Sequence, residues 1–155
     1  MIKTNKDKLP IVSLVGMTEH PKMRQPGYHV GYDGQGRILA GTGGITYNYT
    51  IGDVCVGIAG DHIEPGCSTY NPDDRSNAAY NILSCIGNTA TVLNGEAKGA
   101  KGYVIGTHGG VEHVMIVFGK ETLEKLTLDD RFLVKSVGQG LELTDHPDIK
   151  VFNID

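Results

Sequence analysis

Short apolar runs separated by glycine-rich turns dominate the hydrophobic pattern of the chain and predict a mainly β structure. In residues 45–51, isoleucine and tyrosine alternate with threonine and asparagine, which is the period of a half-buried strand. Residues 11–15 form a run typical of a strand buried on at least one face, and residues 54–59 are apolar on both faces, as in a central strand. Further strand-like runs are 37–40, 89–93, 102–107, 113–118, 131–137, 141–143 and 149–152.

One segment has the pattern of an α-helix, over about residues 72–86. Asn71 is a favourable N-cap, Pro72 suits the first helical position, and apolar residues then recur at helical spacing as far as Ile86. Gly87 provides a stop. A shorter helix is predicted over residues 121–126. We therefore expect residues 1–155 to form a single compact α+β domain, mainly β, with a barrel-like or sandwich-like core and one clear helix.

The composition narrows the class of protein. The 22 glycines are about double the usual share of roughly 7% and are scattered, which favours many tight turns between short strands. The net charge of −4, without a basic block, makes a nucleic-acid partner an unfavourable hypothesis. No apolar run approaches the roughly 18 residues of a membrane span. Three cysteines without a CxxC pair, behind a polar N-terminus, favour a cytoplasmic location.

The first group of candidate catalytic residues is Asp61, His62 and Glu64, between Gly60 and the Pro65-Gly66 turn. On an extended backbone, His62 and Glu64 share one face and Asp61 lies on the other. A histidine and a glutamate on one face can share a metal ion or form a general base with its orienting partner. The alternative is a polar turn whose carboxylates face water, and the sequence leaves both open.

The second group is His108 and His113, which flank the segment Gly109-Gly110-Val111-Glu112. If those four residues form a hairpin loop, the two histidines face each other across antiparallel strands, with Cβ atoms about 5 Å apart. A slip of one residue would break this pairing. If both groups meet, they would form a mixed nitrogen and oxygen site for a divalent transition metal such as zinc, manganese or iron. The ligands would be His62, Glu64, His108 and His113. Asp61 would orient one of these ligands.

Two further features lie near these groups. The turn Gly41-Thr42-Gly43-Gly44 could bind a small-molecule ligand through its backbone N–H groups. The candidate ligand-binding residues are Thr42, Gly43, Gly44 and Asn48. The alternative is a structural tight turn. Cys67 lies shortly before the predicted helix, whose dipole would lower its pKa if the thiol faced it. A small packed core residue is the competing interpretation of Cys67.

Three segments closely resemble a known family: Gly41 to Asn48, Gly60 to Gly66, and Lys98 to Val114 with its KGAKG and HGGVEHV sequences. The family is prokaryotic, occurs in thermophilic and anaerobic bacteria, and is catalogued only as a domain of unknown function. The resemblance covers nearly the whole chain and implies no activity. It implies that this chain is the N-terminal portion of a longer or processed protein. The apolar residues Val151 to Ile154 just before the last residue fit either that interpretation or a C-terminal strand within the sheet.

A weaker likeness concerns residues 92–105, which look like the KOW pattern of small SH3-like barrels in ribosome-associated proteins. That pattern would imply RNA contact, which the acidic net charge opposes, so we take it as an indication of a β-barrel turn.

Two hypotheses of function follow from the sequence. The first is a small-metabolite enzyme or enzyme subunit that uses the histidine and glutamate groups for metal-dependent or acid/base hydrolytic chemistry. The second is a non-catalytic β-rich binding or scaffold subunit, which would associate with a second chain or with a region beyond residue 155. We also expect a homo-oligomer, and a monomeric chain would count against the second hypothesis.

Overall fold

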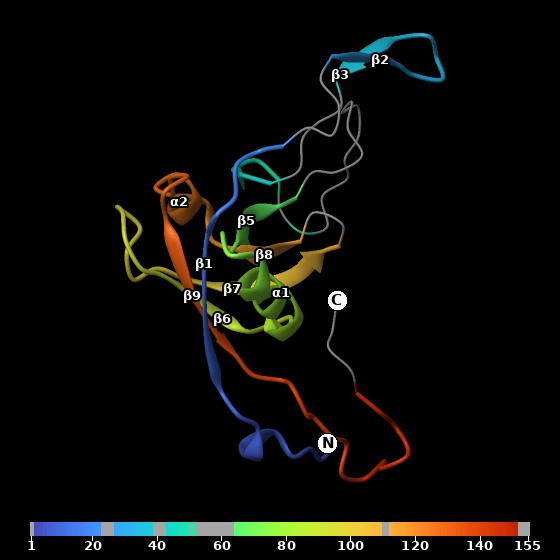
Figure 1. Cartoon of the computed structure of the whole chain (residues 1–155), viewed down its shortest axis with the longest axis vertical. Coiled ribbons are helices and arrows are strands. Elements are labelled where there is room, and N and C mark those ends of the chain that lie inside the picture. The colour runs from blue at the N-terminus through green and yellow to red at the C-terminus, as the bar shows by residue number, and fades with distance from the viewer. Residues whose placement is uncertain are drawn as a thin grey trace.

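A closed antiparallel barrel forms the body of the protein (Figure 1). The computed structural model describes residues 2–22, 27–38, 43–49, 51, 64–109 and 112–151. Seven strands follow the order β1-β9-β6-β7-β8-β5-β4, and β1 also pairs with β5, which closes six of them into a ring. The strands are β1 (Val12–Thr18), β4 (Ile45–Thr46), β5 (Gly66–Tyr70), β6 (Thr89–Val92), β7 (Lys101–His108), β8 (His113–Val117) and β9 (Arg131–Ser136).

The interior of the barrel is filled by alternate residues of these strands, as strand geometry requires. Val114 and Ile116 of β8 are 0% exposed, and they pack with Val104 of β7 and with Phe132 and Val134 of β9. The expected mainly β, barrel-like fold is therefore confirmed. The segment between β6 and β7, which carries the KOW-like pattern, is a turn of this barrel.

Helix α1 (Asp74–Leu83) packs against β1, β5 and β8 and is shorter than the predicted helix over 72–86. Asp73, not Asn71, is its N-cap, because the Asp73 side chain accepts a hydrogen bond from the Ser76 N–H at 2.8 Å. The helix inserts Tyr80 into the core, where Gly16 of β1 lies so close that a Cβ on it would be 2.5 Å from the Tyr80 ring. Ile82, which contributes to the apolar periodicity, is 58% exposed instead.

Among the described residues, the predicted strand over residues 45–51 is wrong beyond β4, which ends at Thr46. Tyr47 and Ile51 are 46% and 59% exposed. The reason lies in the partner strand, because β4 pairs with β5 only at Cys67 and Gly66. The residue before Gly66 is Pro65, which has no N–H with which to extend the ladder. The predicted strand over 54–59 lies outside the described residues.

The predicted strands over 141–143 and 149–152 are also wrong within the described residues. This region forms only isolated bridges, from Thr4 to Leu143 and from Glu142 to Lys150. Strand β9, which precedes it, is already paired on both sides, with β1 and β6. A closed barrel offers no free edge there for an additional strand.

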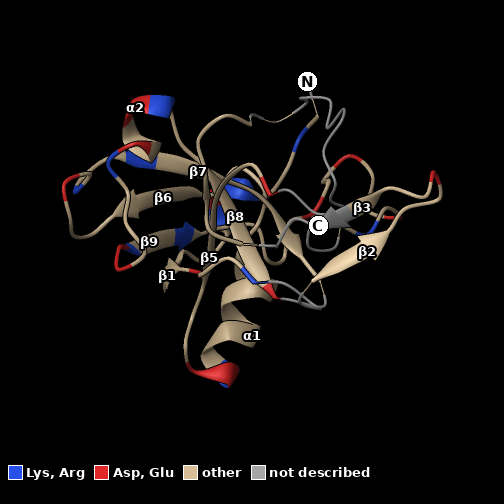
Figure 2. Cartoon of the chain, turned by 90° about the horizontal axis from the view of Figure 1, so that it is seen from above, with Lys and Arg blue, Asp and Glu red and all other residues tan. Residues whose placement is uncertain are grey.

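Three small elements lie outside the barrel wall: a 3-10 helix (Lys6–Lys8), the short helix α2 (Lys120–Leu123), and the hairpin of β2 (Tyr28–Val30) and β3 (Gly36–Ile38). The hairpin projects from one end of the molecule (Figure 1). In Figure 2, the Lys and Arg residues of the described part of the chain are interspersed with Asp and Glu. None of the helices in the described part of the chain is long and apolar enough to cross a membrane.

Candidate functional site

A cluster of one glutamate and two histidines lies on the outer face of the barrel wall. Glu64 precedes β5 by two residues, His108 ends β7, and His113 begins β8. Side chains alternate between the two faces of a strand, so His113 and Met115 lie on the face opposite to that of the core residues Val114 and Ile116. His108 and His113 are directly paired across the two strands, so the predicted register is confirmed.

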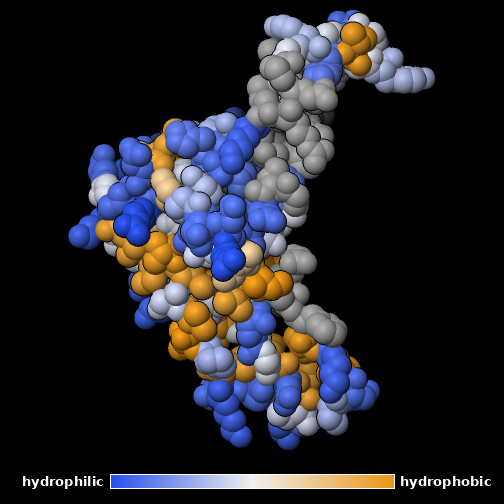
Figure 3. All heavy atoms as spheres, in the orientation of Figure 1, coloured by the Kyte–Doolittle hydropathy of each residue, from blue (hydrophilic) through white to orange (hydrophobic). Residues whose placement is uncertain are grey.

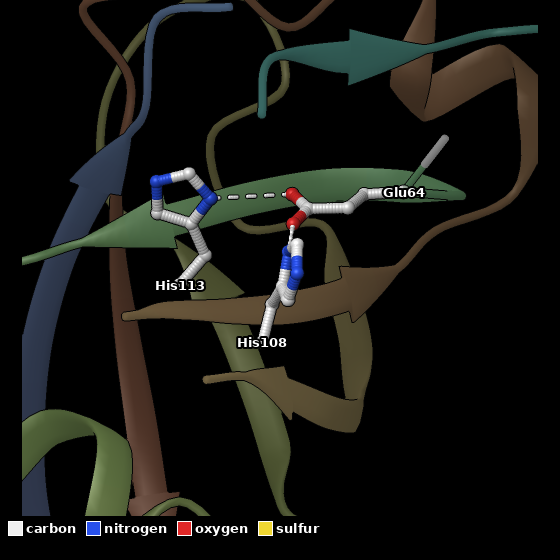
Figure 4. A group of neighbouring side chains, drawn as sticks. All are labelled: Glu64, His108 and His113. Carbon is white, nitrogen blue, oxygen red and sulfur yellow. Dashed lines mark hydrogen bonds and ion pairs between the residues drawn. The ribbon is translucent and has the colours of Figure 1, made fainter. Parts of the chain in front are cut away.

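The Glu64 carboxylate lies between the two imidazoles (Figure 4). Its Oε1 contacts Nδ1 of His108, and its Oε2 lies 3.3 Å from Nδ1 of His113. The same Oε2 accepts hydrogen bonds from the Ser68 hydroxyl and, at 3.1 Å, from the Gly43 N–H. Both oxygens of one carboxylate thus connect four segments of the chain.

These contacts set the charge of Glu64. The side chain is only 5% exposed, and burial raises the pKa of its carboxyl group. Hydrogen bonds from His113, Ser68 and His108 outweigh burial, and together they lower the pKa of Glu64 to about 2. Glu64 is therefore a carboxylate at neutral pH, and it can serve as a metal ligand or as the acceptor that orients an imidazole.

Glu19 is a fourth member of the cluster that the sequence analysis missed. It follows β1 directly and is 3% exposed. Its Oε2 lies 3.3 Å from Nε2 of His113, at ion-pair distance although not aligned as a hydrogen bond. Lys22 Nζ lies 3.0 Å from the same oxygen and compensates its charge. His113, which is 0% exposed, thus has a carboxylate beside each ring nitrogen.

The glycine turn supplies another side of the site. Gly43 has φ of +89°, and a Cβ on it would lie 3.2 Å from Cε1 of His113 and 3.3 Å from Cγ of Glu19. Gly44 is buried, and its carbonyl accepts a hydrogen bond from the Ser68 N–H at 2.9 Å. Gly43 therefore holds a structural position beside Glu64, and Gly44 holds one beside Ser68. Asn48 is exposed in the bend after β4 and, among the described residues, forms no hydrogen bond with the cluster.

Three of the predicted site residues, Thr42, Asp61 and His62, lie outside the described residues. Cys67 lies in β5 and is 0% exposed, and burial raises the pKa of its thiol to about 12. The interpretation of Cys67 as a packed core residue is therefore the right one, and the helix dipole does not activate it.

The geometry of the cluster suits a metal ion. One ligand atom from each of Glu64, His108 and His113 can be chosen so that all lie within 4.8 Å of one another. Ligand atoms around a tetrahedral zinc, with bonds of roughly 2.0–2.1 Å, lie about 3.3 Å apart. The 3.3 Å between His113 Nδ1 and Glu64 Oε2 matches this separation. Glu19 then occupies the place of the carboxylate that commonly orients a metal-bound histidine through its other nitrogen.

The fold and the cluster define a small closed β-barrel with a carboxylate–histidine site on its outer wall. The chain belongs to a family of unknown function, DUF4438, whose N-terminal domain model matches residues 28–155. It is similar to a solved structure described as the crystal structure of TM1086, with 49% sequence identity and a TM-score of 0.89. The match covers 99% of this chain and 54% of that one, so the chain spans about half the length of TM1086. No curated protein matches the sequence.

Proposed function

We propose that the protein binds a divalent transition metal through Glu64, His108 and His113 and uses it for hydrolytic chemistry on a small molecule. The observation that carries this proposal is the convergence of three donor atoms, from three separate segments, within 4.8 Å. Two imidazoles and one carboxylate form a ligand set that suits zinc, manganese or iron. His62, two residues before Glu64 in the sequence, is the candidate fourth ligand, and Asp61 is a candidate orienting residue.

The chemistry proposed for the site has three parts. A bound metal would lower the pKa of a coordinated water to about 7 and so supply a nucleophile at neutral pH. Glu64 would contribute negative charge, since its lowered pKa keeps it ionised. His113, held between Glu64 and Glu19, would have a fixed ring orientation. If proton transfer occurs instead without a metal, His108 Nε2 would be the transferring atom, because Nδ1 contacts Glu64.

The direct test is the metal content of untagged, freshly purified protein, measured by elemental mass spectrometry. We expect about one transition metal per chain in the wild type and a loss of metal in His108→Ala and His113→Ala. The matched control is His146→Ala, because His146 is an exposed histidine outside the cluster and its replacement should retain the metal. Full metal content in both cluster variants would refute the proposed ligand set. Hydrolysis of small amides and esters would then be assayed with the loaded protein.

A second candidate function is a binding subunit that associates with further protein, as a homo-oligomer or with additional chain. It is favoured by the hairpin of β2 and β3, where Tyr28, Val30 and the adjacent Tyr32 are 75%, 78% and 110% exposed. Figure 3 shows hydrophobic residues at this projecting hairpin and in a band over the barrel. Light scattering on the purified chain distinguishes the candidates, because a strict monomer with bound metal would support the enzyme and oppose the oligomer. A cytoplasmic location fits both, since Cys67 and Cys85 are free thiols.

A further inference from the structure

The turn that carries His113 has a strained residue. Glu112 has φ of +55°, in the left-handed region that residues with a side chain rarely adopt. Its own side chain is exposed, and its N–H donates to the His108 carbonyl at 2.8 Å. Backbone strain of this kind persists only where surrounding contacts fix the conformation. Helix α1 supplies such contacts.

Two asparagines of α1 donate to one carbonyl oxygen, that of Glu112. Asn77 Nδ2 lies 3.1 Å from this oxygen and Asn81 Nδ2 lies 2.9 Å from it. Asn77 is only 9% exposed, and its Oδ1 accepts the Asn71 N–H at 2.8 Å, which fixes the orientation of the amide. Because the Glu112 carbonyl belongs to the peptide group that also contains the His113 nitrogen, the two amides hold the backbone that precedes His113.

We propose that Asn77 and Asn81 are positioning residues that hold the Glu112–His113 peptide in its strained conformation and thereby aim the His113 imidazole at Glu64. An unstrained Glu112 would rotate this peptide and redirect the His113 side chain, which begins the next strand. Helix α1 is thus coupled to the cluster although neither asparagine contacts Glu64 or an imidazole among the described hydrogen bonds. The consequence for metal binding rests on the proposed function, whereas the positioning of His113 does not.

The first test uses metal-free protein and the NMR resonances of the His113 imidazole, which report its tautomer and hydrogen bonds. Asn81→Leu removes one donor without adding charge, and we expect it to shift the His113 imidazole resonances. Asn81→Gln keeps an amide donor and should restore them at least in part. Asn94→Leu is the matched control, because Asn94 is also half-buried and donates at 3.0 Å to a loop carbonyl, that of Asp129. Unchanged His113 resonances in Asn81→Leu would overturn the proposal.

A second variant separates positioning from general damage to the fold. Glycine adopts positive φ readily. Residue 112 should therefore keep its backbone conformation in Glu112→Gly without the hydrogen bond from Asn81. We expect Glu112→Gly combined with Asn81→Leu to recover the wild-type His113 resonances, whereas Glu112→Gly combined with Asn94→Leu should leave the wild-type pattern unchanged. Failure of glycine to recover any of the signal would contradict the strain argument.

The metal readout then tests the link to function. In a Co²⁺ titration monitored by visible absorption, Asn81→Leu should weaken binding about 10-fold, within the range for residues that support metal ligands, and should alter the spectrum. If the wild type binds no Co²⁺, the proposed function fails while the NMR result still decides the positioning role. If Asn81→Leu shifts the His113 resonances and binds Co²⁺ as the wild type does, the link to the metal is wrong.

Discussion

Glu19 Oε2 lies 3.3 Å from Nε2 of His113, on the side of the ring opposite to Glu64. A histidine that binds a metal through one ring nitrogen commonly donates the N–H of the other nitrogen to a carboxylate, a backbone carbonyl or water. In the proposed metal site, Glu19 would therefore orient His113, and Glu64 would lie with the metal at the other ring nitrogen. Lys22 Nζ lies 3.0 Å from Glu19 and compensates the negative charge of this second buried carboxylate.

Replacement of Glu19 by Gln should weaken metal binding without removing a ligand. We expect the dissociation constant for Zn²⁺ or Co²⁺ to rise by roughly 10–100-fold, the range for carboxylates that support metal-bound histidines. Competition with a chromophoric chelator would measure it. Glu121→Gln is the control, because Glu121 is likewise paired with a lysine, Lys125 at 3.0 Å, but lies on α2. Equal affinities in the two variants would contradict the role of Glu19.

The lowered pKa of Glu64 predicts how the stability of the metal-free protein depends on pH. In the unfolded chain the pKa of Glu64 is about 4.5, and in the folded protein it is about 2. The unfolded state therefore binds the proton more tightly, and acid favours unfolding. The contribution is fully present above pH of about 4.5, declines as the pH falls, and is lost below about 2. It amounts to about 3 kcal/mol.

Urea unfolding at several pH values between 7 and 3 would measure this contribution. The free energy of unfolding of the wild type should fall more steeply between pH 5 and 3 than that of Glu64→Gln, which has no carboxyl group at this position. Parallel curves for the two proteins would show that the hydrogen bonds from His113 and Ser68 do not hold Glu64 in its ionised form.

Cys67 should be unreactive in the folded protein, because it is fully buried and its thiolate is disfavoured by a pKa of about 12. Brief treatment with iodoacetamide at pH 7.5, followed by peptide mapping, should leave Cys67 unmodified, and the same treatment in urea should modify it. Modification of Cys67 at comparable rates under both conditions would mean that β5 opens readily from the barrel.

The sequence predicted local features of this site well and long-range ones poorly. The pairing of His108 with His113 follows from a four-residue loop between two apolar strands, so local spacing was enough to predict it. The approach of Glu64, 44 residues from His108, depends on β5 lying beside β8. That neighbour relation is set by the closure of the whole barrel, which no short pattern encodes.

Glu19 was missed because a single glutamate after a strand is common. One indication was nevertheless present: Glu19-His20 stands at the end of the first strand, as Glu64 and His108 stand at strand ends. The helix boundaries failed for a related reason. Asn71 and Asp73 are both good caps, and Asn71 is occupied instead with the β1 carbonyl of Val15, a tertiary contact that residue preference does not reveal.

Gly43 offers a test of how closely the glycine turn fits the cluster. Replacement by Ala would place a Cβ 3.2 Å from His113 Cε1 and 3.0 Å from the His20 carbonyl, at a residue with φ of +89°. Gly34→Ala is the matched control, because Gly34 also has positive φ, +76°, but a Cβ there would meet nothing within 4 Å. Both variants should lose about 1–2 kcal/mol from backbone strain, measured by urea unfolding. Only Gly43→Ala should also displace the His113 ring and weaken Co²⁺ binding, and equal Co²⁺ affinities in the two variants would mean that the turn does not shape the site.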